Sequence, residues 1–225
     1  MRTTRDLRRL RRAALGRADR LAAIAFNAAT LPRSSDALTQ DHLTSYCVIE
    51  LHSTWYGFSR SLYLSSCLGA RDSSGKRVSL SRVRRATTES EALSHAVRRC
   101  KKWRYKATKT QWSWTDEPAW ARSGNLLDAL DEVGATNYAT VSAALGLPGV
   151  AQVLEHLTDF RNFYAHRGED TRARAAFHAL TYALSPRLPP TAILQSNGLR
   201  NGVTRTQPVL MDWVDDVRLL IASAI

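Results

Sequence analysis

The chain has 225 residues, 44% of them hydrophobic, and 32 Lys and Arg against 20 Asp and Glu give a formal net charge of +12. This content suffices for the core of a globular domain, and no apolar run reaches the roughly 20 residues that a membrane-spanning helix needs, so no membrane partner is expected. The positive excess favours an anionic partner such as nucleic acid.

The cysteines and histidines do not indicate a metal site. Cys47, Cys67 and Cys100 are odd in number and form no CxxC pair, so neither a disulfide framework nor a zinc site is indicated, and a reducing, cytoplasmic setting is expected. Four histidines also lack metal-ligand spacing and are interpreted as structural: His52, His95, His156 and His178. No metal or cofactor is expected.

Apolar residues recur along most of the chain at the spacing of three and four that is typical of amphipathic helices, without a strand-like alternation or an internal repeat. The expected fold is an all-α helical bundle. A basic N-terminal helix belongs to an extension over residues 1–40, and a C-terminal helix docks on the main domain, residues 41–225. Helices are expected over residues 4–29, 41–69, 89–102, 118–133, 136–146, 149–165, 170–184 and 208–225.

The connections between these helices are polar or rich in Gly and Pro. Pro32 to Asp36 marks the first break, and residues 70–85 form an exposed basic loop. Residues 185–207 are expected as a long irregular connection, in which two Asn-Gly pairs allow a small hairpin.

The stretch RNFYAHR, Arg161 to Arg167, is the most informative segment. Arg161 follows Leu157 by four residues and precedes Tyr164 by three, which places it on the apolar stripe of its helix, pointing inward. A guanidinium group keeps its charge, so this position requires a carboxylate or a bound anion. Glu50 lies at the edge of the buried face of the 41–69 helix and is one candidate partner.

The same helix is expected to end within the motif. Asn162 and His166 share a face, whereas Arg161 and His166 lie about 140° apart on an ideal helix. Gly168, followed by Glu169, Asp170 and Thr171, is typical of a helix end and a new start. His166 would then stand at a junction beside a cleft. An imidazole and a guanidinium at one cleft suit cleavage of an RNA phosphodiester, because RNA supplies its own 2′-hydroxyl nucleophile.

RNFYAH resembles the Arg-polar-x3-His signature of the HEPN superfamily, and Glu50 to Trp55, followed by Phe58 and Arg60, is similar to the first core helix of its branch related to the RiboL-PSP-associated group. The resemblance implies an all-α bundle, metal-independent endoribonuclease activity, a homodimer that brings two motifs together, and a role as a toxin or phage-defence effector with an antitoxin or regulatory protein as partner. HEPN toxins that are silenced by nucleotidylation carry Tyr where this chain has Gly168, so that regulation is not expected.

The resemblance implies a role for each motif residue. His166 would transfer protons, Arg161 would stabilise the phosphate and Asn162 would act as a positioning residue, with Glu50 as a further catalytic candidate. The residues expected to bind RNA are basic and are listed together: Arg98, Arg99, Lys101, Lys102 and Arg167. Trp112, Trp114 and Trp120 are more typical of packing than of base stacking.

Three other interpretations are open. Arg161 and His166 could make ordinary capping or ion-pair contacts at a helix end. The same cleft could belong to a non-catalytic HEPN-like module that binds RNA or a partner protein. Residues 135–147 have the look of a helix-turn-helix fragment, which would suit a DNA-binding regulator, although the following helix carries Glu155 and Asp159 and few side chains suited to read bases.

Overall fold

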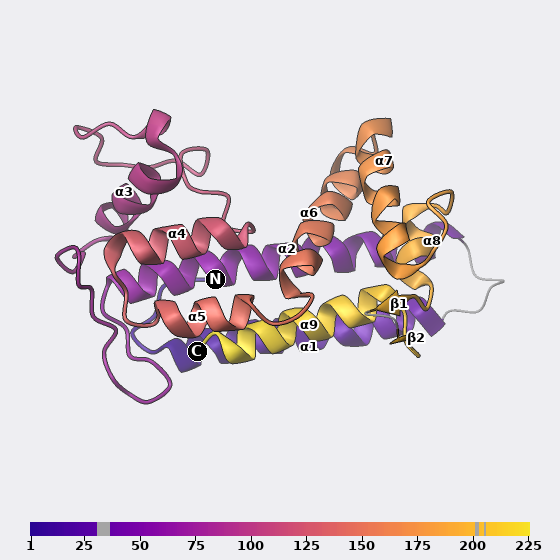
Figure 1. Cartoon of the computed structure of the whole chain (residues 1–225), viewed down its shortest axis with the longest axis horizontal. Coiled ribbons are helices and arrows are strands. Elements are labelled where there is room, and N and C mark those ends of the chain that lie inside the picture. The colour runs from indigo at the N-terminus through magenta and orange to yellow at the C-terminus, as the bar shows by residue number, and fades with distance from the viewer. Residues whose placement is uncertain (31–36, 201–202, 205) are drawn as a thin grey trace. The chain divides into compact units, whose positions relative to one another are not determined.

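The computed structural model of the protein describes residues 1–30, 37–200, 203–204 and 206–225, and its regular structure is almost entirely helical (Figure 1). The all-α prediction is confirmed. The α-helices of the described part are α1 (Leu7–Thr30), α2 (Ala37–Cys67), α3 (Glu89–Cys100), α4 (Ser123–Val133), α5 (Tyr138–Leu145), α6 (Val150–His166), α7 (Glu169–Phe177), α8 (Pro190–Gln195) and α9 (Val209–Ser223). Two 3-10 segments, η1 (Lys102–Arg104) and η2 (His178–Tyr182), accompany them. None of the described helices is long and apolar enough to cross a membrane.

The long connection expected over residues 185–207 is more ordered than the sequence suggests. It contains α8, in which Pro190 occupies the first turn, where the missing N–H of proline costs no hydrogen bond. It also contains the strands β1 (Leu199–Arg200) and β2 (Val203–Thr204), which pair antiparallel as the expected hairpin requires. The second Asn-Gly pair, residues 201–202, and the predicted break from Pro32 to Asp36 lie outside the described residues.

The helix expected from residue 118 begins later, at Ser123. The segment before it is held by tertiary contacts, because the buried carboxylate of Glu117 accepts hydrogen bonds from Arg60 (2.6 and 2.8 Å) and from Trp120 Nε1 (2.9 Å). At the other end, α4 stops at Gly134, which has φ +64°. A Cβ there would lie 2.2 Å from Ser81 Oγ, so glycine meets both a conformational and a spatial requirement.

The chain forms two compact units. Unit 1 comprises Met1–Leu15, Thr54–Ala151 and Leu220–Ile225, and unit 2 comprises Gly16–Ser53 and Gln152–Leu219. The boundaries fall inside α1, α2, α6 and α9, so the division does not coincide with residue 40. The expectation that residues 1–40 form a separate extension stays a prediction.

The core of unit 1 is built on the second half of α2. Trp55, Phe58 and Leu62 are almost completely buried, as their spacing predicts. Trp55 Nε1 donates to the carbonyl of Ala121 at 3.0 Å, which satisfies the one polar atom of that side chain. Trp120 packs against Tyr63 with ring centroids 5.1 Å apart, in line with its predicted packing role.

The core of unit 2 anchors α6, the helix that carries the RNFYAHR motif. Phe160 on α6 meets Trp213 on α9 edge to face, with centroids 5.2 Å apart. Trp213 Nε1 donates to the hydroxyl of Tyr182 at 2.7 Å, and His156 Nδ1 lies 2.7 Å from the same oxygen. Since all four side chains are buried, α6 is a rigid support for its own last turns.

Candidate functional site

The motif occupies the last turns of α6. Arg161 and Asn162 are half-buried, and His166 is exposed as the final residue of the helix. The predicted end of this helix is therefore confirmed to within one residue. An exposed imidazole at a helix end can reach a bound ligand, which is what a proton-transfer group requires.

The backbone reversal after α6 occurs one residue earlier than the glycine suggests. Arg167 adopts φ +53°, and Gly168 has an extended conformation as the N-cap of α7. A non-glycine residue in this region costs about 1 kcal/mol or more, so other contacts must offset the strain. The Arg167 guanidinium donates to Asp41 Oδ2 at 2.7 Å and lies over the ring of Tyr164, 4.9 Å from its centroid. Arg167, which we expect to bind RNA, thus also has a structural role at the turn.

Asp41 connects this turn to α8. Its second oxygen accepts a hydrogen bond from the hydroxyl of Thr191, which in turn lies 3.0 Å from the hydroxyl of Tyr164. Burial raises the pKa of Asp41, but the hydrogen bonds from Arg167 and Thr191 outweigh it and the net shift is downward. Asp41 is therefore ionised at neutral pH, and its charge offsets that of Arg167.

Arg161 is less buried than its place on the apolar stripe suggests. Its Nη1 donates to Asn162 Oδ1 at 3.2 Å, and it forms no ion pair with any described residue. Glu50, the candidate partner, is half-buried on α2 and makes no hydrogen bond or ion pair with Arg161. The guanidinium group therefore keeps its charge without a carboxylate, which leaves it available for a bound anion.

His52 on α2 is a neighbour of Arg161 that the sequence analysis interpreted as structural. Burial lowers the pKa of His52 to about 4, and the positive charge of Arg161 adds to this shift. The imidazole is therefore neutral at pH 7 and can accept or donate a hydrogen bond beside the guanidinium. The sequence shows that His52 directly follows the buried Leu51 on α2, but it does not show that His52 lies near Arg161 on α6.

The lowered pKa makes the stability of unit 2 depend on pH. In the unfolded chain His52 takes up its proton near the usual pH 6.5, whereas in the folded chain it does so near pH 4. Between these values only the unfolded state is protonated, so stability falls as the pH drops. Going from pH 7 to pH 5 should cost the wild type roughly 1–2 kcal/mol more than His52→Gln in urea unfolding. The same pH dependence in both proteins would contradict this placement of His52.

The predicted RNA-binding cations near α3 lie in unit 1, and most of them already have partners. Arg98 Nη2 lies 2.5 Å from Glu132, and Arg99 Nη2 lies 3.3 Å from Asp128, both on α4. Lys101 Nζ donates to the carbonyl of Thr115 at 3.0 Å. Lys102 is exposed and forms no ion pair with a described residue. The two arginines are thus partly neutralised within the protein.

Two exposed tryptophans lie close in sequence to Lys101 and to its hydrogen-bond partner Thr115. Trp103 follows Lys102 in η1 and is 76% exposed, and Trp114 precedes Thr115 and is 80% exposed. The interpretation of Trp114 as a packing residue is therefore wrong, and Trp103 was missed. Aromatic rings interleaved with cations are typical of surfaces that stack and track single-stranded nucleic acid. The exposure of Trp103 had a sequence signal, since it is flanked by Lys102 and Arg104.

The carboxylates of α4 offer a test of this surface. Glu132→Gln with Asp128→Asn should release Arg98 and Arg99, so single-stranded RNA should bind more tightly and with a steeper salt dependence, by up to about 0.7 in the logarithmic slope per cation released. The matched control is Asp19→Asn with Asp215→Asn, which adds the same charge and releases Arg218 in unit 2. Fluorescence anisotropy at several salt concentrations measures both. An equal effect of the two pairs would exclude α3 as the footprint.

Comparisons with models of protein families, with curated proteins and with solved structures gave no match. Among the described residues, no three His, Cys, Asp or Glu side chains are grouped so that they could hold a metal ion. The site therefore consists of a guanidinium group with no carboxylate partner among the described residues, the amide of Asn162 to which it donates, a neutral imidazole on α2 and an exposed imidazole at the end of α6.

Proposed function

We propose that the protein is a metal-independent endoribonuclease of HEPN type, with the end of α6 as its active site. The observation that carries the proposal is the half-buried Arg161, which pairs with no carboxylate in the described part of the chain and lies on the same helix as the exposed His166. A cation that has given up part of its hydration without gaining a counterion is suited to bind an anion, and a phosphodiester is an anion.

The chemistry follows from the groups present. A base removes the proton of an RNA 2′-hydroxyl, the 2′-oxygen forms a bond to the adjacent phosphorus, and the bond from phosphorus to the 5′-oxygen breaks. An acid protonates the departing 5′-oxygen. The products are a 2′,3′-cyclic phosphate and a 5′-hydroxyl. His166 transfers protons, Arg161 stabilises the negative charge on the crowded phosphorus, and Asn162, which bonds to Arg161, positions the guanidinium.

The single histidine of the motif, His166, can serve as base or as acid at a given moment, whereas the reaction needs both. We therefore include in the proposal a homodimer whose twofold axis brings two copies of the motif to one RNA strand. His52, which lies in the electrostatic range of Arg161, and Glu50 on the same helix α2 are candidates to orient the substrate rather than to transfer protons.

The second candidate function is a non-catalytic RNA-binding module. It is favoured by the surface of unit 1, where the exposed Trp103 and Trp114 accompany the α3 cations. Such a module would bind RNA with the salt dependence described above and cut none. A role as a toxin or phage-defence effector, with an antitoxin or regulatory protein as partner, belongs to the proposal in its ribonuclease form.

Cleavage of single-stranded RNA in excess chelator tests the function. The purified protein should release fragments that end in 2′,3′-cyclic phosphate, and light scattering at micromolar concentration should give the mass of a dimer. Cleavage that depends on added magnesium would contradict the proposed chemistry. Cleavage at full rate by a monomer would contradict the proposal that two copies of the motif form one active site. RNA binding without cleavage would favour the second candidate.

A further inference from the structure

Unit 1 contains a cavity of about 840 Å³ that is unrelated to the motif on α6. Its walls come from the segment before α1, from the turn that follows α2 and from the loop that leads to α3. Its volume lies in the range of small-molecule sites. Four arginines line it: Arg5, Arg71, Arg77 and Arg85.

The backbone around these arginines is held by hydrogen bonds between distant segments. Arg71 N donates to the carbonyl of Arg5 at 2.9 Å, and Leu7 N donates to the carbonyl of Arg71 at 2.9 Å. Arg71 also forms an antiparallel bridge with Arg77, which the bond from Val78 N to the carbonyl of Ala70 (2.8 Å) continues. Three segments therefore lie side by side in a preformed frame, which lowers the entropic cost of binding.

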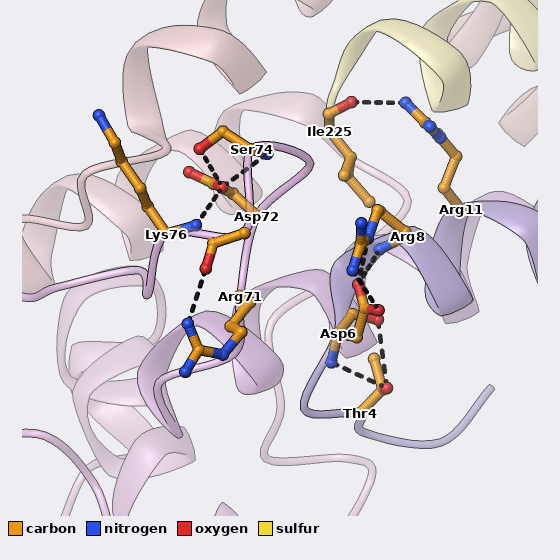
Figure 2. A network of polar contacts seen from close by, with 10 residues as sticks. Thr4, Asp6, Arg8, Arg11, Arg71, Asp72, Ser74, Lys76 and Ile225 are labelled. Carbon is orange, nitrogen blue, oxygen red and sulfur yellow. Dashed lines mark hydrogen bonds and ion pairs between the residues drawn. The ribbon is translucent and has the colours of Figure 1, made fainter.

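The nearest carboxylates in the sequence are directed elsewhere. Asp6 bonds to Arg8, with its Oδ1 2.9 Å from Arg8 N and 3.2 Å from Arg8 Nε (Figure 2). Asp72 Oδ1 accepts from the N and Oγ of Ser74 and from Lys76 N, at 2.7–3.0 Å (Figure 2). As a result, none of the four cavity arginines forms an ion pair within the described part of the chain.

Two of the arginine side chains converge on one glycine. Gly69 has φ +79°, and a Cβ built on it would lie 2.8 Å from Cδ of Arg85 and 3.5 Å from Cδ of Arg77. The absence of a side chain at Gly69 thus makes room for both. Guanidinium groups that share a cavity repel each other, and a bound anion would offset this repulsion.

We propose that this cavity binds an oligophosphate, a chain of two or more linked phosphate groups. One guanidinium group can bind two oxygens of a phosphate with two parallel N–H···O hydrogen bonds. A cavity lined by several guanidinium groups therefore suits a ligand with several phosphates better than a ligand with one. The threonines of the lining already use their hydroxyls as donors to protein oxygens: Thr3 donates to Glu89, Thr4 to the carbonyl of Asp6, and Thr87 to Glu91. Arg71 Nη1 likewise donates to the carbonyl of Gly75 at 2.8 Å, so the donors that remain are mainly those of Arg5, Arg77 and Arg85. The described lining contains no aromatic ring on which a base could stack, so the phosphates are the recognised group.

Calorimetric titration of the full chain with inorganic tripolyphosphate tests the proposal. We expect tripolyphosphate to bind at least tenfold more tightly than orthophosphate or sulfate at the same ionic strength. Arg77→Gln with Arg85→Gln should weaken this binding at least tenfold. The matched control, Lys76→Gln with Arg84→Gln, removes the same charge from the same loop without touching the cavity lining and should change the affinity less than threefold. Circular dichroism and thermal melting confirm that each variant is folded.

Two further ligands identify the source of the oligophosphate. Adenosine triphosphate should bind within about threefold of tripolyphosphate if a free oligophosphate is recognised. If the source is an RNA end, a 2′-O-methyl oligonucleotide with a 5′-triphosphate should bind at least tenfold more tightly than the same oligonucleotide with a 5′-hydroxyl. Arg77→Gln with Arg85→Gln should reduce this difference. Either result supports the site. Equal affinities for tripolyphosphate and orthophosphate, or equal losses in the two double variants, would overturn it. All these readouts are independent of RNA cleavage.

Discussion

His166→Ala should abolish RNA cleavage, with a loss of at least about 10²-fold and up to 10⁴-fold in the single-turnover rate, which is what proton transfer by a positioned side chain contributes. The fold should be unaffected, because the His166 side chain is exposed at the end of α6. Exposed substitutions of this kind change the free energy of unfolding by less than about 0.5 kcal/mol. Quenched single-turnover assays measure the cleavage rate, and urea unfolding of the same preparation measures the free energy of unfolding.

The matched control is His42→Ala, because His42 is also exposed but lies on α2 outside the motif. It should retain wild-type cleavage. Arg161→Ala should lose cleavage as well, and its stability should stay close to wild type, because the truncation strands no carboxylate among the residues that the structure describes. Full cleavage by His166→Ala would remove this histidine from the mechanism.

Arg60→Met should have the largest effect on stability. The carboxylate of Glu117 is only 6% exposed and depends on the two hydrogen bonds from Arg60, which is itself 26% exposed. Removal of the guanidinium leaves a buried charge with Trp120 Nε1 as its remaining side-chain donor. We expect a loss of roughly 2–4 kcal/mol in the free energy of unfolding at pH 7, below the full value for a completely buried pair because Arg60 is partly solvated.

A second substitution separates the stranded charge from lost packing. Glu117→Gln in the Arg60→Met background removes the charge and keeps an oxygen for Trp120, so at least half of the stability should return. Arg82→Ala is the control for an exposed pair, since Arg82 and Asp131 are 58% and 41% exposed, and it should cost less than about 1 kcal/mol. A double variant no more stable than Arg60→Met would show that packing, and not the carboxylate, accounts for the loss.

The helices with a regular apolar stripe were the most predictable part of the fold. The spacing of Leu51, Trp55, Phe58 and Leu62 identified the buried face of α2, because each turn of an amphipathic helix repeats the same requirement. The end of α6 was predicted from Gly168 and the polar residues after it. The predicted boundaries were wrong where tertiary contacts decide them. A helix was expected from residue 118, but the bonds of Glu117 to Arg60 and Trp120 hold the segment before Ser123 outside α4.

The candidate site was predictable in its residues and not in their partners. RNFYAHR drew attention to Arg161 and His166, and the inward position of Arg161 indicated a carboxylate or a bound anion. The structure places the amide of Asn162 beside Arg161 and His52 in its electrostatic range, and neither neighbour was predicted as its partner. The arginine cavity was not predictable, since Arg5 and Arg85 lie 80 positions apart in the sequence and meet only through long-range backbone pairing. Such pairings depend on the fold and leave no local periodicity.

The most direct test of the ribonuclease chemistry uses a single atom of the substrate. A short RNA is mapped for its preferred cleavage site, and a second copy is synthesised with 2′-deoxyribose at that one nucleotide. We expect the protein, in chelator, to cut the first RNA to a 2′,3′-cyclic phosphate and to leave that site in the second RNA intact, because the nucleophile is missing. Cleavage of the deoxy-substituted bond at a comparable rate would show that water attacks instead and would contradict the proposed use of Arg161 and His166.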